Sequence, residues 1–378
     1  MDRIKVSLTR CPDYSQEGVQ TAVDRALDDI GGIGSIVLPG NTVLLKPNML
    51  TDREPDCAVT THPEIVRALI RTVRRHGGRP MVADSPANVT KIERVWDRTG
   101  FRALCDQENV PLINLEKAGS SSVTVNGITF TIAQPVLDAD VLISVPKIKT
   151  HMLTVFTGAV KNLYGTVPGF QKTTLHKLHP KPADFGKLIA AIYSRLKPQL
   201  AVADAIVGMD GEGPSSGNPI KIGLIAASRD SVALDTTLCR FLKIDTRAVP
   251  YFKPLAEASL GETLRDRIQI VGTQTEEVLP QPFRVPSSLP GRLIPKPLVR
   301  LLEPYLWIRP HFLERCVSCG RCVKACPVTA LHIENKGRPV LDAGKCIGCC
   351  CCHEVCPEKA VEMRLSPLLS FMRRGRLP

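Results

Sequence analysis

The chain has 378 residues, of which 43% are hydrophobic, 23% are charged and 4% are aromatic, and its formal net charge is +12. This is enough apolar material for one large α/β unit and a small appended domain. A basic surface suits nucleic acid, an anionic membrane, an acidic partner or an anionic substrate, but the low aromatic content disfavours nucleic-acid binding by base stacking.

No run of about 18 apolar residues occurs, and the first six residues lack the long apolar stretch of a signal peptide. We therefore expect a soluble, cytoplasmic protein. Fourteen cysteines in such a compartment indicate metal ligation rather than disulfides. Cys11, Cys57, Cys105 and Cys239 lack ligand spacing and are interpreted as packed thiols.

Strand and helix signals alternate up to residue 272. Residues 4–8 and 42–45 are predicted as short buried strands on either side of a helix over 16–30. A second helix begins at the capping box Thr61-His62-Pro63-Glu64 and ends at Gly77-Gly78. The remaining signals are a strand over 81–83, a hairpin over 123–132 around Asn126-Gly127, a buried strand over 141–145, a helix near 185–196, and strands near 200–202 and 222–226. This alternation predicts the α/β class, with a mostly parallel sheet and helices on both of its faces.

The segment over 145–165 follows the predicted strand 141–145, at the sheet edge where ligands bind in open α/β folds. Four cationic residues fall within it: Lys147, Lys149, His151 and Lys161. They would repel one another unless they shared an anion. We therefore expect an anionic small-molecule substrate, and the alternative is a surface loop with separately solvated lysines.

Residues 280–313 contain eight prolines among apolar and basic residues. We interpret this segment as a linker that packs on the α/β unit. A membrane-surface helix is the less favoured alternative, and the same alternative applies to the basic tail over 365–378.

Two copies of the pattern Cys-x2-Cys-x2-Cys-x3-Cys-Pro start at Cys316 and Cys346, which are 346 − 316 = 30 residues apart. The pattern resembles bacterial two-cluster ferredoxins, in which the fourth cysteine of each copy ligates the cluster of the other copy. We expect two 4Fe-4S clusters, one bound by Cys316, Cys319, Cys322 and Cys356, and the other bound by Cys346, Cys349, Cys352 and Cys326. Zinc is the alternative metal for paired Cys-x2-Cys motifs, but the proline after each fourth cysteine favours clusters.

Cys350 and Cys351 lie inside the second copy and are not needed as ligands. They are interpreted as small apolar fillers, although they would also allow the ligand register to shift. The expected organisation is an α/β domain over 1–279, the linker over 280–313, a small α+β ferredoxin-like domain over 314–364 and the basic tail.

Short motifs spread over residues 2–275 together resemble the family called "domain of unknown function 362". They are Lys46-Pro47-Asn48, Thr61-His62-Pro63, Asp84-Ser85-Pro86, Lys147-Ile148-Lys149-Thr150-His151, the segment 158–165, Gly211-Glu212-Gly213-Pro214 and Ala233-Leu234-Asp235. Members often carry a two-cluster ferredoxin module at the carboxyl end. The resemblance implies the α/β fold and marks the motif positions Lys46, Asn48, His62, Asp84, Lys149, His151, Lys161, Asn162, Glu212 and Asp235.

A second resemblance covers eleven positions. The segment from His151 to Lys161 is similar to the His-x4-Phe-Ser-Gly-Gly-x-Lys stretch of the nickel-pincer lactate racemase. It implies that His151 is an acid or base and that Lys161 holds a cofactor or a substrate carbonyl. Racemisation does not need electron-transfer clusters, so this interpretation ranks second.

We expect an iron-sulfur oxidoreductase, a reductase that takes electrons from a redox partner protein and relays them through two clusters to an anionic substrate or cofactor. His151 is the expected general acid, and Lys46, Lys149 and Lys161 are expected to stabilise the negative charge that develops. The expected substrate-binding residues are Asn48, His62, Asp84, Lys147, Asn162, Glu212 and Asp235. The alternatives are a nickel-pincer-like isomerase and a non-enzymatic electron carrier or cluster donor. A flavin or nickel cofactor is neither indicated nor excluded.

Overall fold

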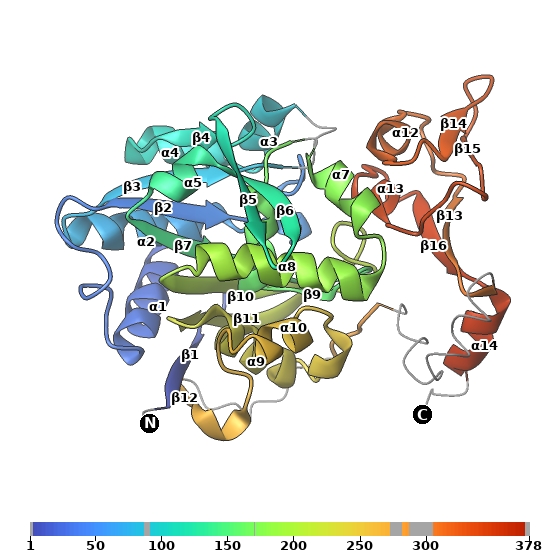
Figure 1. The fold of residues 1–378 in the computed structure, drawn as a ribbon. Helices are drawn as coiled ribbons and strands as arrows, with labels where there is room; N and C mark the ends of the chain where they lie inside the picture. The colour runs from blue at the N-terminus through green and yellow to red at the C-terminus, as the bar shows by residue number, and fades with distance from the viewer. Residues whose placement is uncertain (1–2, 87–90, 170, 273–281, 287–304, 375–378) are drawn as a thin grey trace.

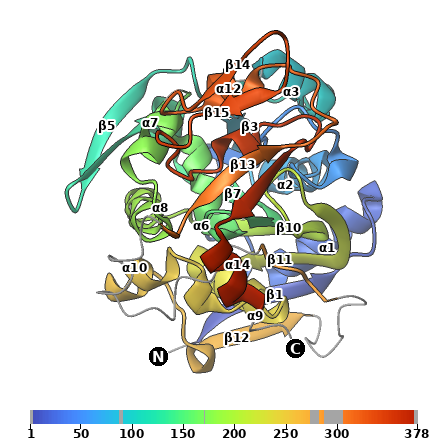
Figure 2. The ribbon, with the colours of Figure 1, turned by 90° about the vertical axis from the view of Figure 1, so that its right-hand side faces the viewer.

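The computed structural model describes residues 3–86, 91–169, 171–272, 282–286 and 305–374. A large α/β part and a smaller carboxyl-terminal part lie side by side, and both views show the smaller part at one end of the large sheet (Figures 1 and 2). Of the predicted linker over 280–313, most lies outside the described residues. The predicted domain boundaries therefore stay predictions.

The large part is built on a ten-stranded mixed sheet. Eight of the strands follow the order β12-β1-β11-β10-β7-β2-β3-β4, and off this path β8 pairs with β10 and with β9. Its strands are β1 (Ile4–Arg10), β2 (Thr42–Pro47), β3 (Arg79–Asp84), β4 (Leu112–Asn114), β7 (Val141–Val145), β8 (Lys147–His151), β9 (Val155–Thr157), β10 (Leu200–Asp210), β11 (Asn218–Ser228) and β12 (Ile268–Gly272). The run from β10 to β4 is parallel, and β11 is antiparallel to both of its neighbours. The predicted α/β class with a mostly parallel sheet is confirmed.

Helices cover both faces of this sheet, as predicted. They are α1 (Gln16–Asp29), α2 (Pro63–Arg75), α3 (Ile92–Arg98), α4 (Phe101–Glu108), α5 (Gln134–Asp138), α6 (Ala159–Asn162), α7 (Gln171–Leu178), α8 (Pro182–Leu196), α9 (Ser231–Phe241) and α10 (Phe252–Glu257), with 3-10 turns η1 (Pro55–Cys57), η2 (Leu163–Thr166), η3 (Thr246–Ala248) and η4 (Arg265–Arg267). Residues of α1 to α4 share one core with Val43 and Leu45 of β2, whereas residues of α5 to α10 share the other core with Leu44. Successive residues of β2 thus face opposite cores, as the twofold repeat of a strand requires.

Two local predictions can be compared directly with the structure. The hairpin of β5 (Ser120–Val125) and β6 (Ile128–Ala133) is confirmed, with both Asn126 and Gly127 at positive φ. The predicted capping box needs correction, because the N-cap of α2 is His62, whose Nδ1 accepts from the Glu64 N–H at 3.2 Å. Thr61 instead donates its hydroxyl to the Val145 carbonyl at 2.7 Å.

The described residues of the smaller part form two short antiparallel sheets and three helices. Its elements are β13 (Ile308–Phe312), α12 (Arg321–Ala325), β14 (Leu331–Ile333), β15 (Pro339–Leu341), α13 (Cys351–Glu354), β16 (Val361–Leu365) and α14 (Pro367–Arg374). β13 pairs with β16, and β14 pairs with β15. Among the described residues, none of the helices is both long and apolar enough to span a bilayer.

Side chains and carbonyl groups join the two parts directly. Arg321 of α12 forms an ion pair with Asp52 at 3.0 Å, and His353 Nε2 of α13 lies 2.9 Å from the Glu212 carbonyl oxygen. The Ser215 hydroxyl donates to the Glu354 carbonyl at 2.7 Å. The loops that make these contacts follow the carboxyl ends of β2 and β10, so the smaller part covers the ligand-binding edge of the sheet.

Candidate functional site

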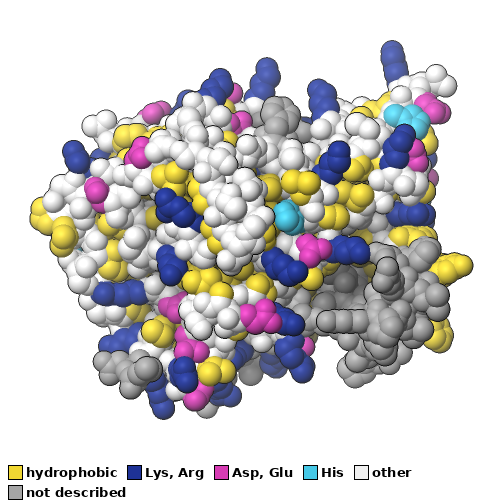
Figure 3. Space-filling model, viewed as in Figure 1, with side chains coloured by type: hydrophobic (Ala, Val, Ile, Leu, Met, Phe, Trp, Pro, Cys, Tyr) yellow, Lys and Arg dark blue, Asp and Glu magenta, His cyan; other side chains and the backbone are white. Residues whose placement is uncertain are grey.

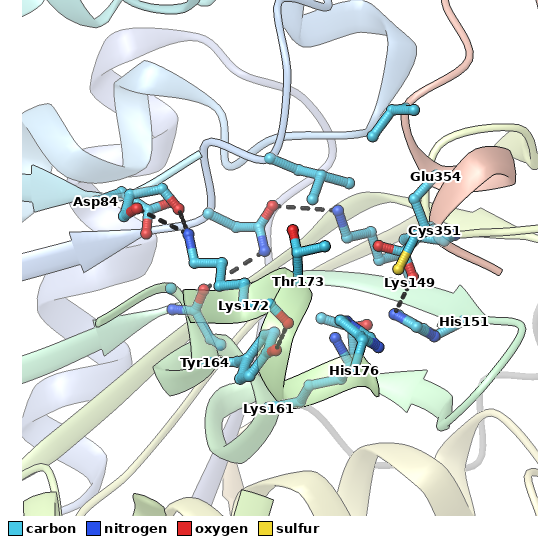
Figure 4. Close-up of a pocket in the computed structure, with 18 of the residues that line it drawn as sticks. Asp84, Lys149, His151, Lys161, Tyr164, Lys172, Thr173, His176, Cys351 and Glu354 are labelled. Atoms are coloured by element: carbon cyan, nitrogen blue, oxygen red, sulfur yellow. Dashed lines mark hydrogen bonds and ion pairs between the residues drawn. The ribbon is translucent and has the colours of Figure 1, made fainter. Parts of the chain in front are cut away.

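A cavity of about 100 Å³ lies between the carboxyl edge of the large sheet and helix α13 (Figure 4). Its lining includes seven of the residues expected from the sequence: Lys46, Asn48, Asp84, Lys149, His151, Lys161 and Asn162. It also includes Leu50, Ser85, Thr157, Tyr164, Gly165, Lys172, Thr173, His176 and Pro214 of the large part, and Ala325, Cys351, Glu354 and Val355 of the smaller part. The two parts therefore build this cavity together.

Lys46 and Asp84, at the ends of β2 and β3, form a buried ion pair at 2.7 Å. The Lys46 ammonium also donates to the Pro47 carbonyl at 2.8 Å and to Asn162 Oδ1 at 3.1 Å, so its three N–H groups are all used. Burial lowers the pKa of Lys46, and the Asp84 carboxylate opposes that shift. At Gly165, a Cβ atom would overlap Asp84 Oδ1 and lie 2.6 Å from Lys46 Nζ, so this position has no room for a side chain. The pair supports the wall of the cavity.

Lys172 of α7 is also fully engaged. Its ammonium donates to the carbonyl and the hydroxyl of Ser85 and to the Pro86 carbonyl. Burial lowers its pKa to about 8. No sequence signal pointed to this lysine, because no helix was predicted over α7.

Lys149 and Lys161 keep donors that the protein does not use. The Lys149 ammonium donates to Asn48 Oδ1 at 3.1 Å and to the Val59 carbonyl at 2.5 Å, which leaves one N–H. Among the described residues, the Lys161 ammonium has no hydrogen-bond or ion-pair partner, and it lies 5.8 Å from the centre of the Tyr164 ring. Four N–H groups on these two lysines are therefore available to a ligand.

Burial controls the charge of both lysines. It lowers the pKa of Lys149 well below its usual value, and the nearby Lys161 adds to that shift. It lowers the pKa of Lys161 to about 8, while the Glu354 carboxylate opposes the shift. The four lysines of the cavity outnumber its two carboxylates, Asp84 and Glu354, so an anion would be stabilised there.

His151 is held as a neutral imidazole. Its Nδ1 accepts from the N–H groups of Leu153 at 3.1 Å and Thr154 at 3.4 Å, so the proton resides on Nε2, which lies 3.2 Å from Glu354 Oε1. Burial lowers the pKa of His151 to about 4, and Lys161 reinforces the shift. The expected role of His151 as general acid stays a prediction; in this structure its Nε2 lies against Glu354 and its Nδ1 accepts two backbone N–H groups.

Glu354 and Cys351 come from α13 and bring the smaller part into the site. The Glu354 side chain is only 13% exposed. Burial raises its pKa, but the charge that His151 carries when it is protonated below about pH 4, the hydrogen bond with His151 and the nearby His176 and Lys161 outweigh burial and bring the pKa to about 2. Sequence reasoning missed Glu354 because it lies between the third and fourth cysteines of the second motif, where the cysteine pattern specifies no residue type.

Two further polar atoms, on side chains that line the cavity, have no partner among the described residues. They are His176 Nδ1 and Thr157 Oγ1, and both are buried. His176 stacks on Phe185 with ring centres 4.5 Å apart, and burial lowers its pKa to about 4. Buried polar atoms normally have partners, so these atoms mark where a ligand would supply them. His176 is not among the site residues predicted from the sequence.

Four predicted substrate-binding residues lie outside the cavity. Lys147 forms a buried ion pair with Asp204 at 2.7 Å, and His62 stacks on Tyr14, which binds the same pair. A register shift between the pairs Asp204/Lys147 and Met209/Lys149 separates Lys147 from Lys149.

The other two, Asp235 and Glu212, have structural partners. The Asp235 carboxylate accepts from the N–H groups of Ala159 at 2.6 Å and Val160 at 3.0 Å. It therefore holds the start of α6, the helix that carries Lys161. Burial raises the pKa of Asp235 to about 7. Glu212 contacts the smaller part through its backbone carbonyl oxygen, which lies 2.9 Å from His353 Nε2.

The cysteines of the smaller part surround two further cavities. One is lined by Cys316, Cys319, Cys322 and Cys356, and the other by Cys326, Cys346, Cys349 and Cys352 together with Cys350. These are the crossed sets expected from the sequence. Within the described residues no three His, Cys, Asp or Glu side chains are arranged for a single metal ion, whereas cysteines around a void suit a multi-atom cluster.

The two cysteine sets differ in their surroundings. Cys319 of the first set is exposed, whereas Cys349 of the second set is buried. Cys351 and Ala325, which line the ligand cavity, are close in sequence to Cys352 and Cys326 of the second set. The wall of the ligand cavity therefore includes residues that are adjacent in sequence to cysteines of the second set.

Comparisons with known proteins agree with this division. The family model described as "Domain of unknown function (DUF362)" matches residues 43–240, and the model for a 4Fe-4S dicluster domain matches residues 311–357. The chain is 34% identical to the thylakoid-associated protein sll1697 of Synechocystis over 259 residues, which are 68% of this chain and 80% of that protein. These matches confirm the resemblance to the family and the ferredoxin-type iron-sulfur domain.

Two ferredoxins match short stretches of the chain. They are a ferredoxin of Pyrobaculum islandicum, 46% identical over 12% of this chain and 43% of that protein, and an uncharacterized ferredoxin of Methanocaldococcus jannaschii, 33% identical over 17% and 43%. The chain thus spans less than half the length of either. Among solved structures, the lactate racemase apoprotein of Thermoanaerobacterium thermosaccharolyticum has 12% identity and a TM-score of 0.43, covering 64% of this chain and 57% of that chain. A TM-score this low assigns no reaction to the chain.

Proposed function

The chain belongs to the family described as domain of unknown function (DUF362), and we propose that it is an iron-sulfur oxidoreductase that reduces an anionic ligand. The observation that carries the proposal is the shared cavity, in which unused lysine donors of the α/β part face Cys351 and Glu354 of the 4Fe-4S part. Fusion of a redox domain to a binding domain shortens the path for electrons.

The anionic character of the ligand rests on the unused donors. Lys149 has one free N–H, Lys161 has three, and His176 Nδ1 and Thr157 Oγ1 add two unpartnered atoms among the described residues. Lys46 and Lys172 are excluded from direct binding because their donors are already taken. The ligand's negative charge therefore belongs at the end of the cavity near Lys161.

Lys161 is the proposed proton donor. A lysine with a pKa of about 8 is largely protonated at neutral pH and still acidic enough to release its proton to a ligand that gains negative charge. His151 acts as a positioning residue, since its Nε2–H faces the Glu354 carboxylate. In this scheme the ligand gains two electrons and one proton, and water reprotonates Lys161.

Two 4Fe-4S clusters would supply one electron each when reduced. The proposed ligands are the two crossed cysteine sets that line the cavities of the smaller part. The Ala330 N–H donates to Cys326 Sγ and the Ala360 N–H to Cys356 Sγ, both at 3.2 Å, which favours a thiolate at each. The exposed Cys319 marks the side where a redox partner protein would deliver electrons.

The isomerase alternative is less well supported. It requires His151 to exchange a proton with a substrate, but both ring nitrogens face protein atoms. A plain electron carrier would have no use for a buried cavity with unpaired lysine donors.

Anaerobic purification followed by metal analysis and mass spectrometry of released small molecules tests the proposal. We expect about eight irons per chain and an anionic molecule that is lost in Lys161→Met. Lys345→Met is the matched control, because Lys345 is exposed and paired with Asp342 at 2.9 Å. Retention of the same molecule by Lys161→Met would contradict the proposal, and nickel with a pyridinium adduct would support the isomerase instead.

A further inference from the structure

Three aromatic residues of the smaller part flank the strand pair of β13 and β16: two precede β13 and one lies on α14, which follows β16. Phe371, 77% exposed, and Tyr305, 64% exposed, are the two most exposed aromatic side chains among the described residues. Trp307, half-buried, is the third member. We call Tyr305, Trp307 and Phe371 the aromatic patch.

The fold brings these residues together from two distant segments. β13 starts directly after Trp307 and pairs with β16, with Ile308 opposite Leu365. The Ser366 N–H then donates to the Trp307 carbonyl at 2.9 Å, at the start of α14. The aromatic patch therefore lies where α14 leaves the sheet (Figure 1).

Helix α14 has one buried side and one exposed side. Leu369 is 6% exposed, whereas Phe371, two residues later, points away from it, because two helical steps turn the chain by about 200°. Phe371 is thus not part of the core face of its own helix. Hydrophobic side chains project at the right-hand edge of the molecule in Figure 3, where Figure 1 places α14.

Arginine residues accompany the aromatic patch. The Arg309 guanidinium lies 4.6 Å from the centre of the Trp307 ring. Among the described side chains, Arg309 lies on β13, and Arg364 on β16 pairs with Glu362 at 3.3 Å, while the sequence of the tail adds Arg373, Arg374 and Arg376. The region is therefore basic as well as aromatic.

We propose that the aromatic patch docks on the interfacial region of a membrane that contains anionic lipids. Aromatic rings with a polar atom prefer the headgroup level of a bilayer, and nearby arginines are attracted to anionic lipid surfaces. A stable protein interface needs about 800 Å² from each partner, which three side chains do not provide. Since no described helix spans a bilayer, the contact is peripheral.

Vesicle flotation of the anaerobically purified holoprotein tests this docking. Wild-type protein should float with vesicles of phosphatidylcholine and phosphatidylglycerol and much less with phosphatidylcholine alone, and added salt should weaken binding. The double variant Tyr305→Ser and Phe371→Ser should lower the bound fraction about tenfold or more. The control is Leu178→Ser, because Leu178 is equally exposed at 64% but lies at the end of α7.

The visible spectrum of the holoprotein shows whether each variant has kept its fold. No flotation of the wild type, or equal flotation of the double variant and the control, would overturn the proposal. A dimer that the double variant abolishes, without vesicle binding, would also overturn it and would assign the patch to a second copy of the chain.

A second measurement uses the fluorescence of Trp307. The chain has two tryptophans, so Trp96→Phe leaves Trp307 as the sole reporter. Its emission should shift to shorter wavelength when anionic vesicles are added, because the ring moves into a less polar layer. An unchanged emission maximum at saturating vesicle concentration would count against docking through this patch.

Discussion

The Nε2 atom of His151 lies 3.2 Å from Oε1 of Glu354. His151 ends β8 of the α/β part, and Glu354 lies between the third and fourth cysteines of the second cysteine motif. This contact joins the ligand cavity to the iron-sulfur part. It also directs the Nε2 side of His151 toward a carboxylate, which is the arrangement on which the proposed positioning role rests.

Replacing Lys161 should raise the stability of the protein and abolish its function. Lys161→Met removes the ammonium of a half-buried lysine that has no acidic partner at hydrogen-bond distance among the described residues, so the ligand-free protein should unfold at a higher temperature at pH 7. The fall of the lysine pKa from 10.5 to about 8 corresponds to up to about 3 kcal/mol, and water in the cavity reduces this figure. The same variant should lose reduction of the anionic ligand.

The pH dependence of stability provides a second test of Lys161. Its folded-state pKa of about 8 lies below the unfolded value of 10.5, so between these values the unfolded chain binds more protons. Stability of the wild type should therefore rise, relative to Lys161→Met, from pH 8 to pH 10.5. Calorimetry at one fixed scan rate measures the difference, and a constant difference across this range would contradict the assigned pKa.

Asp84→Asn should destabilise the protein strongly. The substitution leaves the Lys46 ammonium buried without a counter-charge, which costs about 3–5 kcal/mol. Asp184→Asn is the control, because its pair with Lys187 is exposed and contributes less than about 1 kcal/mol. Equal shifts in unfolding temperature for the two variants would show that the buried pair is not a major support of the cavity.

Gly165→Ala should disturb the ion pair between Lys46 and Asp84 by steric overlap. Its Cβ would collide with Asp84 Oδ1 and press on Lys46, whereas at Gly344 the nearest atom, Asp342 Oδ1, would be 3.4 Å away. We expect Gly165→Ala to lower stability and ligand binding, and Gly344→Ala to be nearly neutral. Thermal unfolding of both variants, with ligand retention by mass spectrometry, makes the comparison.

The crossed ligand sets predict which cysteine variants share a phenotype. Cys319→Ala and Cys356→Ala should remove the same cluster signal in electron paramagnetic resonance, and Cys346→Ala and Cys326→Ala should remove the other. Cys351→Ala should keep about eight irons per chain. Loss of the same signal in Cys356→Ala and Cys346→Ala would mean that each motif binds its own cluster.

The fold class and the ferredoxin-type 4Fe-4S domain could be predicted because both depend on local patterns. The alternation of apolar segments indicates strands and helices, and the cysteine spacing identifies the ligand type. Five of the seven predicted residues that line the cavity lie at or just after the carboxyl ends of β2, β3 and β8, and the other two, Lys161 and Asn162, lie in α6.

The errors have long-range causes. Lys147 differs from Lys149 because the register between β8 and β10 shifts, which the pattern of the segment does not reveal. The state of His151 depends on two backbone N–H groups and on Glu354, which is 203 positions away in the sequence. Glu354 itself reaches the cavity only because the smaller part docks on the sheet edge.

The most direct test of the account is rapid mixing of the dithionite-reduced protein with the anion that co-purifies with it, under anaerobic conditions, while the visible absorption of the clusters is followed. The account predicts rapid reoxidation of the wild type and reoxidation slowed at least about a hundredfold in Lys161→Met, as expected when a proton donor is lost. Ferricyanide, which can take electrons at the protein surface, should reoxidise both proteins at the same rate. Equal rates with the co-purifying anion would contradict the claim that electrons leave through the lysine-lined cavity.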